Sequence, residues 1–394
     1  MLYHLFQWLQ ETDFPGIHLM NFISFRAIAA AVVSMLFSLF AGNKIINLLR
    51  RKQIGEDIRD LGLEGQLQKK GTPTMGGVII IAAILTGVLL ICDLTNIYVQ
   101  LLILTTIWSG ALGFADDYIK VFKHRKEGLS EKMKLIFQLL LGLVIALIVC
   151  ISPAIPTDNL VTTIPFVKAH EFDYSWLSPF HGQLGVYCTW GIYMLLIVIV
   201  ITACSNGANL TDGMDGLSAG TSAIVGVVMG VLAWVGGNVI NADYLGVMYL
   251  PGTGEIAIFM SAFVGALIGF LWYNSYPAQV FMGDTGSLTL GSIIGVCAVL
   301  LRKELLLPIL CGIFFVESLS VLIQRAHFRR TKKKYGEGRR VFKMAPLHHH
   351  FQKEGIPALI TKPERAVPEA KIVARFWIVG IILGVLTLAM LKLR

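Results

Sequence analysis

The stretch LLILTTIWSGALGFADDYIK, residues 101–120, contains the two features that define this chain. Its first fifteen residues carry no charge, and two adjacent aspartates, Asp116 and Asp117, then end the run. An apolar run of this kind is typical of a bilayer crossing, which takes roughly 20 residues. Carboxylates close to hydrocarbon cost free energy. The rest of the sequence must therefore explain why two of them stand here.

The overall composition is that of a membrane protein. The 394 residues are 55% apolar and only 15% charged, and the mean hydropathy is +0.69. Soluble domains carry about 25% charged residues. We predict an all-α integral membrane protein, one polytopic membrane domain over residues 1–394, with about ten transmembrane helices. The predicted spans are 23–43, 75–92, 97–115, 134–151, 186–204, 216–236, 255–273, 285–301, 304–324 and 373–391.

The distribution of Lys and Arg predicts the orientation of these spans. The connections after odd-numbered spans hold 26 of these residues, whereas those after even-numbered spans hold 3. Because basic connections stay in the cytoplasm, we expect both termini to be periplasmic and the loop 325–372 to be cytoplasmic. Residues 1–20 lack the basic start and apolar core of a signal peptide, and we expect them to form a short periplasmic surface helix.

Five polar clusters marked by glycine or histidine all fall on odd-numbered connections. Two of these connections contain no Lys or Arg but hold three aspartates, at positions 212, 215 and 284. Loops selected only for solubility rarely have this composition. We therefore expect them to line one acidic site that opens to the cytoplasm. The clusters are KKGTPTMGG (69–77), GFADDYIK (113–120), SNGANLTDGMDGLS (205–218), NSYPAQVFMGDTGS (274–287) and MAPLHHHFQKEG (344–355).

A hard divalent cation would remove the repulsion among the gathered carboxylates. Mg²⁺ is commonly bound through one or two carboxylates together with substrate phosphates. Asp116 and Asp117 diverge by about 100° on a helix, so one can bind the ion while the other acts as a base. The alternative is a solvated helix end at the membrane boundary. For Asp284, at the start of a predicted span, the alternative is a helix cap.

The other clusters suit a phosphorylated nucleotide. Asn209, Asp212 and Asp215 are spaced by three, on one side of a helical turn, where they could read a nucleobase and ribose or simply cap the next span. Phe281 could stack on a base or pack in the core. The consecutive histidines favour phosphate contacts over zinc, because zinc ligands are usually spaced along a helix face. Cations for phosphates, or plain membrane anchors, are Lys69, Lys70, Lys120, Lys132 and Lys134.

Taken together and in order, the clusters resemble those of the phospho-N-acetylmuramoyl-pentapeptide transferases. This family belongs to the polyprenyl-phosphate N-acetylhexosamine-1-phosphate transferases. The quoted motifs are PTMGG, GFADD, NLTDG, VFMGDTGS and LHHHF, and the resemblance covers about residues 20–394. It implies an Mg²⁺-dependent enzyme of the bacterial inner membrane, a homodimer, and two substrates, UDP-MurNAc-pentapeptide and undecaprenyl phosphate. The basic surface also suits the lipid bilayer, and nucleic acid is not expected as a partner.

The resemblance assigns roles to individual residues. Asp116, Asp117 and Asp284 would form the catalytic centre, with Mg²⁺ at Asp284 and either Asp116 or Asp117 as a further ligand. We interpret Asp117 as the base. Residues implied for the uridine end are Lys70, Asn209, Asp212, Asp215 and Phe281. Residues implied for phosphates or sugar are Asn274, His348, His349 and His350, with Lys132 as an added phosphate contact.

Two alternatives and two departures remain. A sister transferase that uses UDP-N-acetylglucosamine is the nearest alternative, and a transporter or flippase is the other. Transporters carry ionisable groups near the bilayer midplane. Here the interiors of the predicted spans are nearly free of such groups, and Glu317 is the main exception. We interpret Glu317 as a partner of a nearby polar group. Gln352 replaces an expected acid after the histidines. The connections 152–185 and 237–254 look long and have no evident catalytic role.

Overall fold

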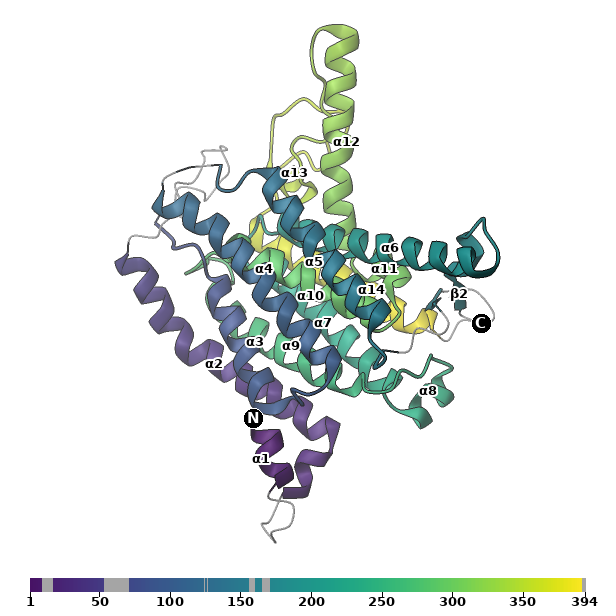
Figure 1. The fold of residues 1–394 in the computed structure, drawn as a ribbon. Helices are drawn as coiled ribbons and strands as arrows, with labels where there is room; N and C mark the ends of the chain where they lie inside the picture. Colours follow the sequence, from purple (N-terminus) through teal and green to yellow (C-terminus); the bar gives the residue numbers. More distant parts are fainter. Residues whose placement is uncertain are drawn as a thin grey trace.

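The computed structural model describes residues 1–8, 17–52, 71–123, 125, 127–155, 160–164 and 171–391. Within these residues nearly all of the regular structure is helical, and the long helices pack side by side into a bundle (Figure 1). The long helices are α2 (Ile23–Arg51), α3 (Gly77–Ile91), α4 (Ile97–Phe122), α5 (Glu131–Ile151), α6 (Gly182–Thr211), α7 (Leu217–Gly236), α9 (Gly254–Asn274), α10 (Gly283–Leu300), α12 (Gly312–Tyr335) and α14 (Glu369–Met390).

Short elements connect these helices. The only described strands, β1 (Val161–Thr163) and β2 (Glu171–Asp173), form an antiparallel pair in which Thr162 lies opposite Phe172. The short helices are α1 (Leu2–Trp8), η2 (Ile17–Asn21), η4 (Tyr174–Leu177), α8 (Val239–Leu245), η5 (Glu304–Leu306), α11 (Leu307–Leu310) and α13 (Leu347–Gln352). Helix α1 lies within residues 1–20, where a short surface helix was expected.

The predicted membrane class is confirmed. Among the described residues, eight helices are long and apolar enough to cross a membrane, and a bent pair gives a ninth. Helix α3 is also apolar but has only 15 residues. Each of the ten predicted spans overlaps one of these segments. Several helices also extend beyond their apolar run. Helix α4, for example, continues to Phe122 and carries Asp116 and Asp117 on its last turns.

The ninth predicted span, 304–324, corresponds to a bent pair of helices and not to one continuous helix. The segment Glu304–Leu310 meets α12 at an angle of 77°. The break lies at Cys311, whose backbone leaves helical geometry with φ −94° and ψ 28°. Gly312 follows, and a Cβ there would lie 2.9 Å from Leu383 Cδ1 of α14. The chain therefore turns where α12 starts against α14, and α12 projects from the bundle (Figure 1).

Helix α10 lies at the centre of the bundle, and 89% of its apolar segment is buried. Its start is approached very closely by two other helices at glycines. A Cβ on Gly113 of α4 would lie 2.3 Å from the Asp284 carbonyl oxygen, and one on Gly77 of α3 would lie 2.1 Å from Gly286 N. Only glycine permits such contact. The glycines of GFADD and PTMGG therefore bring α3, α4 and the start of α10 together.

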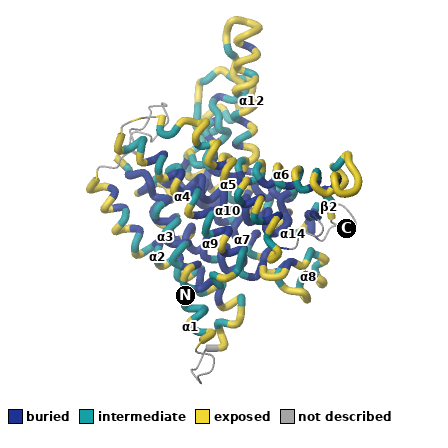
Figure 2. Tube along the Cα trace, in the orientation of Figure 1, coloured by how far each residue is buried: buried dark blue, intermediate teal, exposed yellow. Residues whose placement is uncertain are grey.

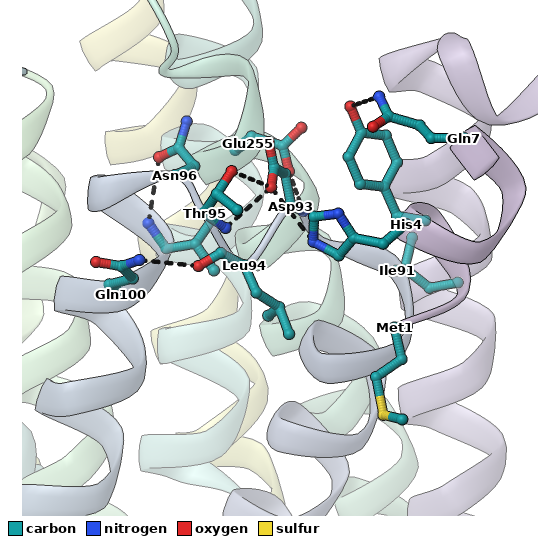
Figure 3. Close-up of polar contacts among 12 residues, drawn as sticks. Met1, His4, Gln7, Ile91, Asp93, Leu94, Thr95, Asn96, Gln100 and Glu255 are labelled. Atoms are coloured by element: carbon teal, nitrogen blue, oxygen red, sulfur yellow. Dashed lines mark hydrogen bonds and ion pairs between the residues drawn. The ribbon is translucent and has the colours of Figure 1, made fainter.

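The end of the bundle opposite these clusters is fixed by buried charges. Arg26 donates to both carboxylate oxygens of Glu255, at 2.6 and 2.8 Å, and also to the Ile91 carbonyl. The Arg26 guanidinium carbon lies 3.9 Å from the centroid of the Tyr3 ring of α1. Figure 3 shows the contacts of His4 and Glu255 with the Asp93 turn in this region. The N-terminal helix is thus tied to α2, α3 and α9.

The long connection before α6 has a structural role at the same end. Thr163 N and Thr162 Oγ1 both donate to the Arg302 carbonyl, and the Lys303 ammonium donates to Thr163 Oγ1. Tyr174 donates its hydroxyl to Glu304, 2.8 Å away. The strand pair therefore packs on the turn that follows α10, and that turn is buried.

Candidate active site

The described parts of the five polar clusters meet at one end of the bundle. The loop before α3 is hydrogen-bonded to the loop before α10, because Phe281 N donates to Pro73 O and Gly76 N donates to Phe281 O, both at 2.8 Å. The loop before α7 joins them through Gly216 N, which donates to Asn274 Oδ1. Segments that lie between residues 71 and 355 thus form one surface, as the parity of the connections predicted.

Three carboxylates form the centre of this surface. Asp116 and Asp117 come from α4, and Asp284 comes from the first turn of α10. One carboxylate oxygen of each lies within 4.8 Å of the others. Asp116 and Asp117 are buried, whereas 16% of the Asp284 side chain is exposed. Asp284 is therefore the carboxylate that a ligand can reach most easily.

Asp117 holds the start of α10. Its Oδ2 accepts hydrogen bonds from Thr285 N at 2.9 Å and Thr285 Oγ1 at 2.6 Å, and its Oδ1 accepts one from Asp284 N at 3.2 Å. The first amides of a helix lack partners inside the helix, and a carboxylate also suits the positive end of the helix dipole. Asp117 therefore caps α10 from another helix and fixes the position of Asp284.

Two lysines lie between the other two carboxylates. Lys120 Nζ is 2.7 Å from Asp116 and 3.2 Å from Asp284, and Lys134 Nζ is 2.9 Å from Asp116 and 2.6 Å from Asp284. Lys120 stands one turn after Asp116 on α4, whereas Lys134 comes from the first turn of α5. The two positive charges balance the two carboxylates that they join.

Asn209 completes the surroundings of Asp284. Its side-chain amide donates to Asp284 Oδ1 and to Ser287 Oγ, both at 2.9 Å. It lies near the end of α6, beyond the predicted span 186–204. The prediction for Asn209 was a nucleotide contact, and the structure places it beside the acidic centre.

The donor set fits a hard divalent cation. Hard cations such as Mg²⁺ prefer carboxylate oxygens, and this site offers three carboxylates from two helices within one small volume. Asp116 Oδ2 is fully buried and lies at ion-pair distance from both lysine ammonium groups. The ammonium groups supply the positive charge that a metal ion would supply there.

Two residues that were predicted to bind the donor join the loops in this structure. Asn274 is 3% exposed, and its amide donates to Val280 O while its Oδ1 accepts from Gly216 N. Asp215 is 4% exposed and accepts from Ala278 N at 3.0 Å. Asp212 ends α6 and is half-buried. Phe281 is also half-buried, and its backbone clamps the loop before α3.

The three histidines of α13 have different surroundings. His348 is fully buried; its ring nitrogen lies 3.2 Å from Glu317 Oε2, and its amide donates to Glu317 Oε1 at 3.2 Å. The interpretation of Glu317 as a partner of a polar group is thus confirmed. His350 is also buried. Its Nδ1 accepts from Lys343 N and its Nε2 lies 2.8 Å from Lys362 O, and burial lowers its pKa.

His349 is the histidine of this loop that remains half-exposed. Its Nδ1 lies 2.9 Å from Gln352 Oε1, and Gln352 Nε2 donates to Glu369 at 3.4 Å. The other Glu369 oxygen accepts from Asp215 N at 2.8 Å. Sequence reasoning missed Glu369, which stands more than 150 residues after Asp215. Its position just before the last apolar run was the available signal.

One predicted lysine, Lys132, is not brought to the centre. Lys132 is exposed, because it stands two residues before Lys134 and therefore lies on the other side of α5. Lys70 lies outside the described residues. Lys120 and Lys134, which the sequence had already identified as possible phosphate cations, are the lysines that contact the acidic centre.

The comparisons with known proteins agree with this arrangement. The family described as "Glycosyl transferase family 4" matches residues 99–302, and the "Phospho-N-acetylmuramoyl-pentapeptide-transferase signature 1" matches residues 69–81. Proteins named phospho-N-acetylmuramoyl-pentapeptide-transferase are 54% identical in Parabacteroides distasonis, 52% in Porphyromonas gingivalis and 50% in Flavobacterium psychrophilum, over the full length of both chains. The chain therefore belongs to the phospho-N-acetylmuramoyl-pentapeptide-transferase family.

Proposed function

We propose that this protein transfers phospho-N-acetylmuramoyl-pentapeptide from its UDP-linked donor to undecaprenyl phosphate. The products are UMP and undecaprenyl-pyrophosphoryl-MurNAc-pentapeptide, the lipid I of peptidoglycan synthesis. The observation that carries the proposal is the cluster of Asp116, Asp284, Lys120 and Lys134 at one end of an apolar bundle. An apolar acceptor tail can stay in lipid while its phosphate reaches this cluster.

The chemistry needs two anionic reactants to meet. In the reaction, a lipid phosphate oxygen forms a bond to the sugar-side phosphorus, and the bond between that phosphorus and UMP breaks. One pyrophosphate link replaces another, so no further energy source is required. Catalysis of such transfers depends mainly on positioning and charge stabilisation. Lys120 and Lys134 neutralise the phosphates, and Asn209 keeps Asp284 oriented.

Asp284 and Asp116 are the residues that would hold Mg²⁺. Bound there, Mg²⁺ would supply positive charge for the pyrophosphate and for the leaving UMP. We assign to Asp117 the role of accepting the proton of the lipid phosphate, whose second pKa is about 6. Its two oxygens face the start of α10, so protonation of Asp117 would cost it one of its three hydrogen bonds.

The site is proposed to face the cytoplasm of the bacterial inner membrane. The support is the Lys and Arg asymmetry, because 26 of these residues lie on the connections that carry the cluster. A homodimer is also proposed from the family resemblance. Cysteine labelling of Glu127→Cys in intact cells tests the orientation, since labelling by a membrane-impermeant reagent from outside would contradict it.

The deciding experiment measures UMP release by the purified protein in detergent. We expect release only when UDP-MurNAc-pentapeptide, a polyprenyl phosphate and Mg²⁺ are all present. Turnover with UDP-N-acetylglucosamine but not with the pentapeptide donor would favour the sister transferase. Lipid-linked transport without UMP release would favour a transporter, which the placement of the carboxylates at helix ends argues against.

A further inference from the structure

Helix α12 has one face that no other part of the described chain covers. Figures 1 and 2 show it projecting from the bundle with exposed residues along its length. Phe315, Leu319 and Leu322 are 54%, 39% and 64% exposed. Their spacing of four and three residues places them on one side of the helix. In a membrane protein, this apolar face is suited to contact with lipid tails.

The same face becomes basic two turns later. Arg329, Arg330 and Lys333 are exposed, and at 100° per residue each lies within about 60° of the direction of Phe315. Leu322 and Arg329 are seven residues apart, which is about 10 Å along the helix axis. The helix is continuous between them. We call Arg329, Arg330 and Lys333 the basic stripe.

The opposite face of α12 is covered by the chain that returns from its tip. Gln324 Oε1 accepts hydrogen bonds from Val341 N and Phe342 N, both at 3.0 Å. Arg339 N donates to Thr331 Oγ1 at 2.8 Å. These contacts join the helix and the returning segment into one arm. The basic stripe therefore keeps its outward direction instead of folding back onto the protein.

We propose that the basic stripe is a docking surface for anionic phospholipid headgroups, in the leaflet next to the acidic centre. A helix face that contacts lipid tails and continues for two turns must next reach the headgroups of that leaflet. Charge agrees with this placement, because residues 325–340 contain eight Lys and Arg but a single acid, Glu337. Arginine also forms paired hydrogen bonds with phosphate oxygens.

Docking would fix the direction of α12 relative to the site. The first half of α12 carries Glu317, which accepts from the amide of His348 and so holds the histidine loop. A headgroup contact at the far half of the same helix would restrain this loop from outside. The inference rests on the membrane class of the chain and not on the proposed reaction, so either can fail without the other.

The test uses the full-length protein in nanodiscs, with a spin label at Glu337→Cys beside the stripe. Cys188→Ser removes the one cysteine that is not buried. The measured quantity is relaxation of the label by nickel chelated to lipid headgroups. We expect it to increase when phosphatidylglycerol is added to phosphatidylcholine, and to decrease at high salt.

The decisive variant is the triple change Arg329→Gln, Arg330→Gln and Lys333→Gln. Each basic residue near an anionic surface increases the binding constant for that surface about fivefold. We therefore expect the phosphatidylglycerol-dependent relaxation of the label to decrease at least about fivefold in the triple variant. The matched control, Arg50→Gln, Arg51→Gln and Lys52→Gln, removes three exposed cations at the end of α2 and should leave the contact unchanged.

Three results would overturn the proposal. Relaxation could be equal in anionic and zwitterionic discs, which tests the unaltered stripe and does not depend on the folding of any variant. The triple variant could behave like its control. Inorganic phosphate could abolish the contact at matched ionic strength, which would assign the stripe to soluble phosphates and not to headgroups.

Discussion

The two ends of the bundle both contain charged residues, but they use them differently. At the end near α1, Arg26 meets Glu255 through two hydrogen bonds and also binds the Ile91 carbonyl, so each group has fixed partners. At the other end, Lys120 and Lys134 are each shared between Asp116 and Asp284. Shared partners can be exchanged for phosphates or a metal ion without unfolding the protein. We therefore expect the fixed pair to serve stability and the shared pairs to serve binding.

The largest expected effect is that of Asp284→Asn, which tests whether the shared pairs serve the reaction. The amide keeps the size of the side chain and removes its charge, so the site loses its most accessible carboxylate. We expect UMP release to decrease about a thousandfold, equivalent to about 4 kcal/mol. Thermal unfolding in detergent should remain close to that of the unaltered protein. Normal turnover would show that the assigned centre is wrong.

The reciprocal change, Glu255→Gln, tests the fixed pair. It leaves the buried Arg26 guanidinium without its counter-charge, and removal of one partner of a buried ion pair costs about 3 kcal/mol of folding stability. We expect a lower midpoint in thermal unfolding, with the turnover of the folded fraction unchanged. A large decrease in turnover without loss of stability would mean that the two ends do not divide these tasks.

Thr285→Val sharpens the comparison at the site itself. The Thr285 hydroxyl donates to Asp117 at 2.6 Å, and valine keeps the shape but removes this donor. A hydrogen bond to a charged group contributes about 2 kcal/mol, so we expect turnover to decrease about thirtyfold. Ser287→Ala, which removes a hydroxyl beside Asn209, is the matched control and should have a smaller effect. Equal effects of the two changes would argue against a special role of the Asp117 cap.

The sequence predicted where the polar clusters meet but not how their atoms pair. Parity of the connections was sufficient to place Asp116, Asp117 and Asp284 at one end, since every span reverses direction. It could not distinguish Lys132 from Lys134, because that choice depends on the helical register of α5. The sequence likewise could not predict the close approach of α4 to α10 at Gly113, since this contact depends on Asp284, 171 residues away.

The histidines illustrate the same limit. Three consecutive identical residues offer no sequence signal to separate them, yet Glu317, Lys343 and Lys362 give two of them specific partners. The broken ninth span was missed because its apolar composition continues through Cys311. Composition determines which segments enter the membrane, whereas bends and partners depend on contacts between distant segments.

The smallest expected effect concerns His350, a fixed group at the site end. Burial lowers the pKa of His350 from its ordinary 6.5, so the folded protein favours the neutral ring. The unfolded chain then binds the proton more readily, and stability contributed by this residue is present above pH 6.5 and decreases as the pH falls toward the lowered pKa. We expect the unfolding midpoint to decrease in that window. His350→Asn keeps an acceptor for Lys343 N but cannot titrate, so its midpoint should be lower overall and show a weaker dependence on pH. If the unfolding midpoint of His350→Asn changed with pH as steeply as that of the unaltered protein, the acid sensitivity would belong to another group.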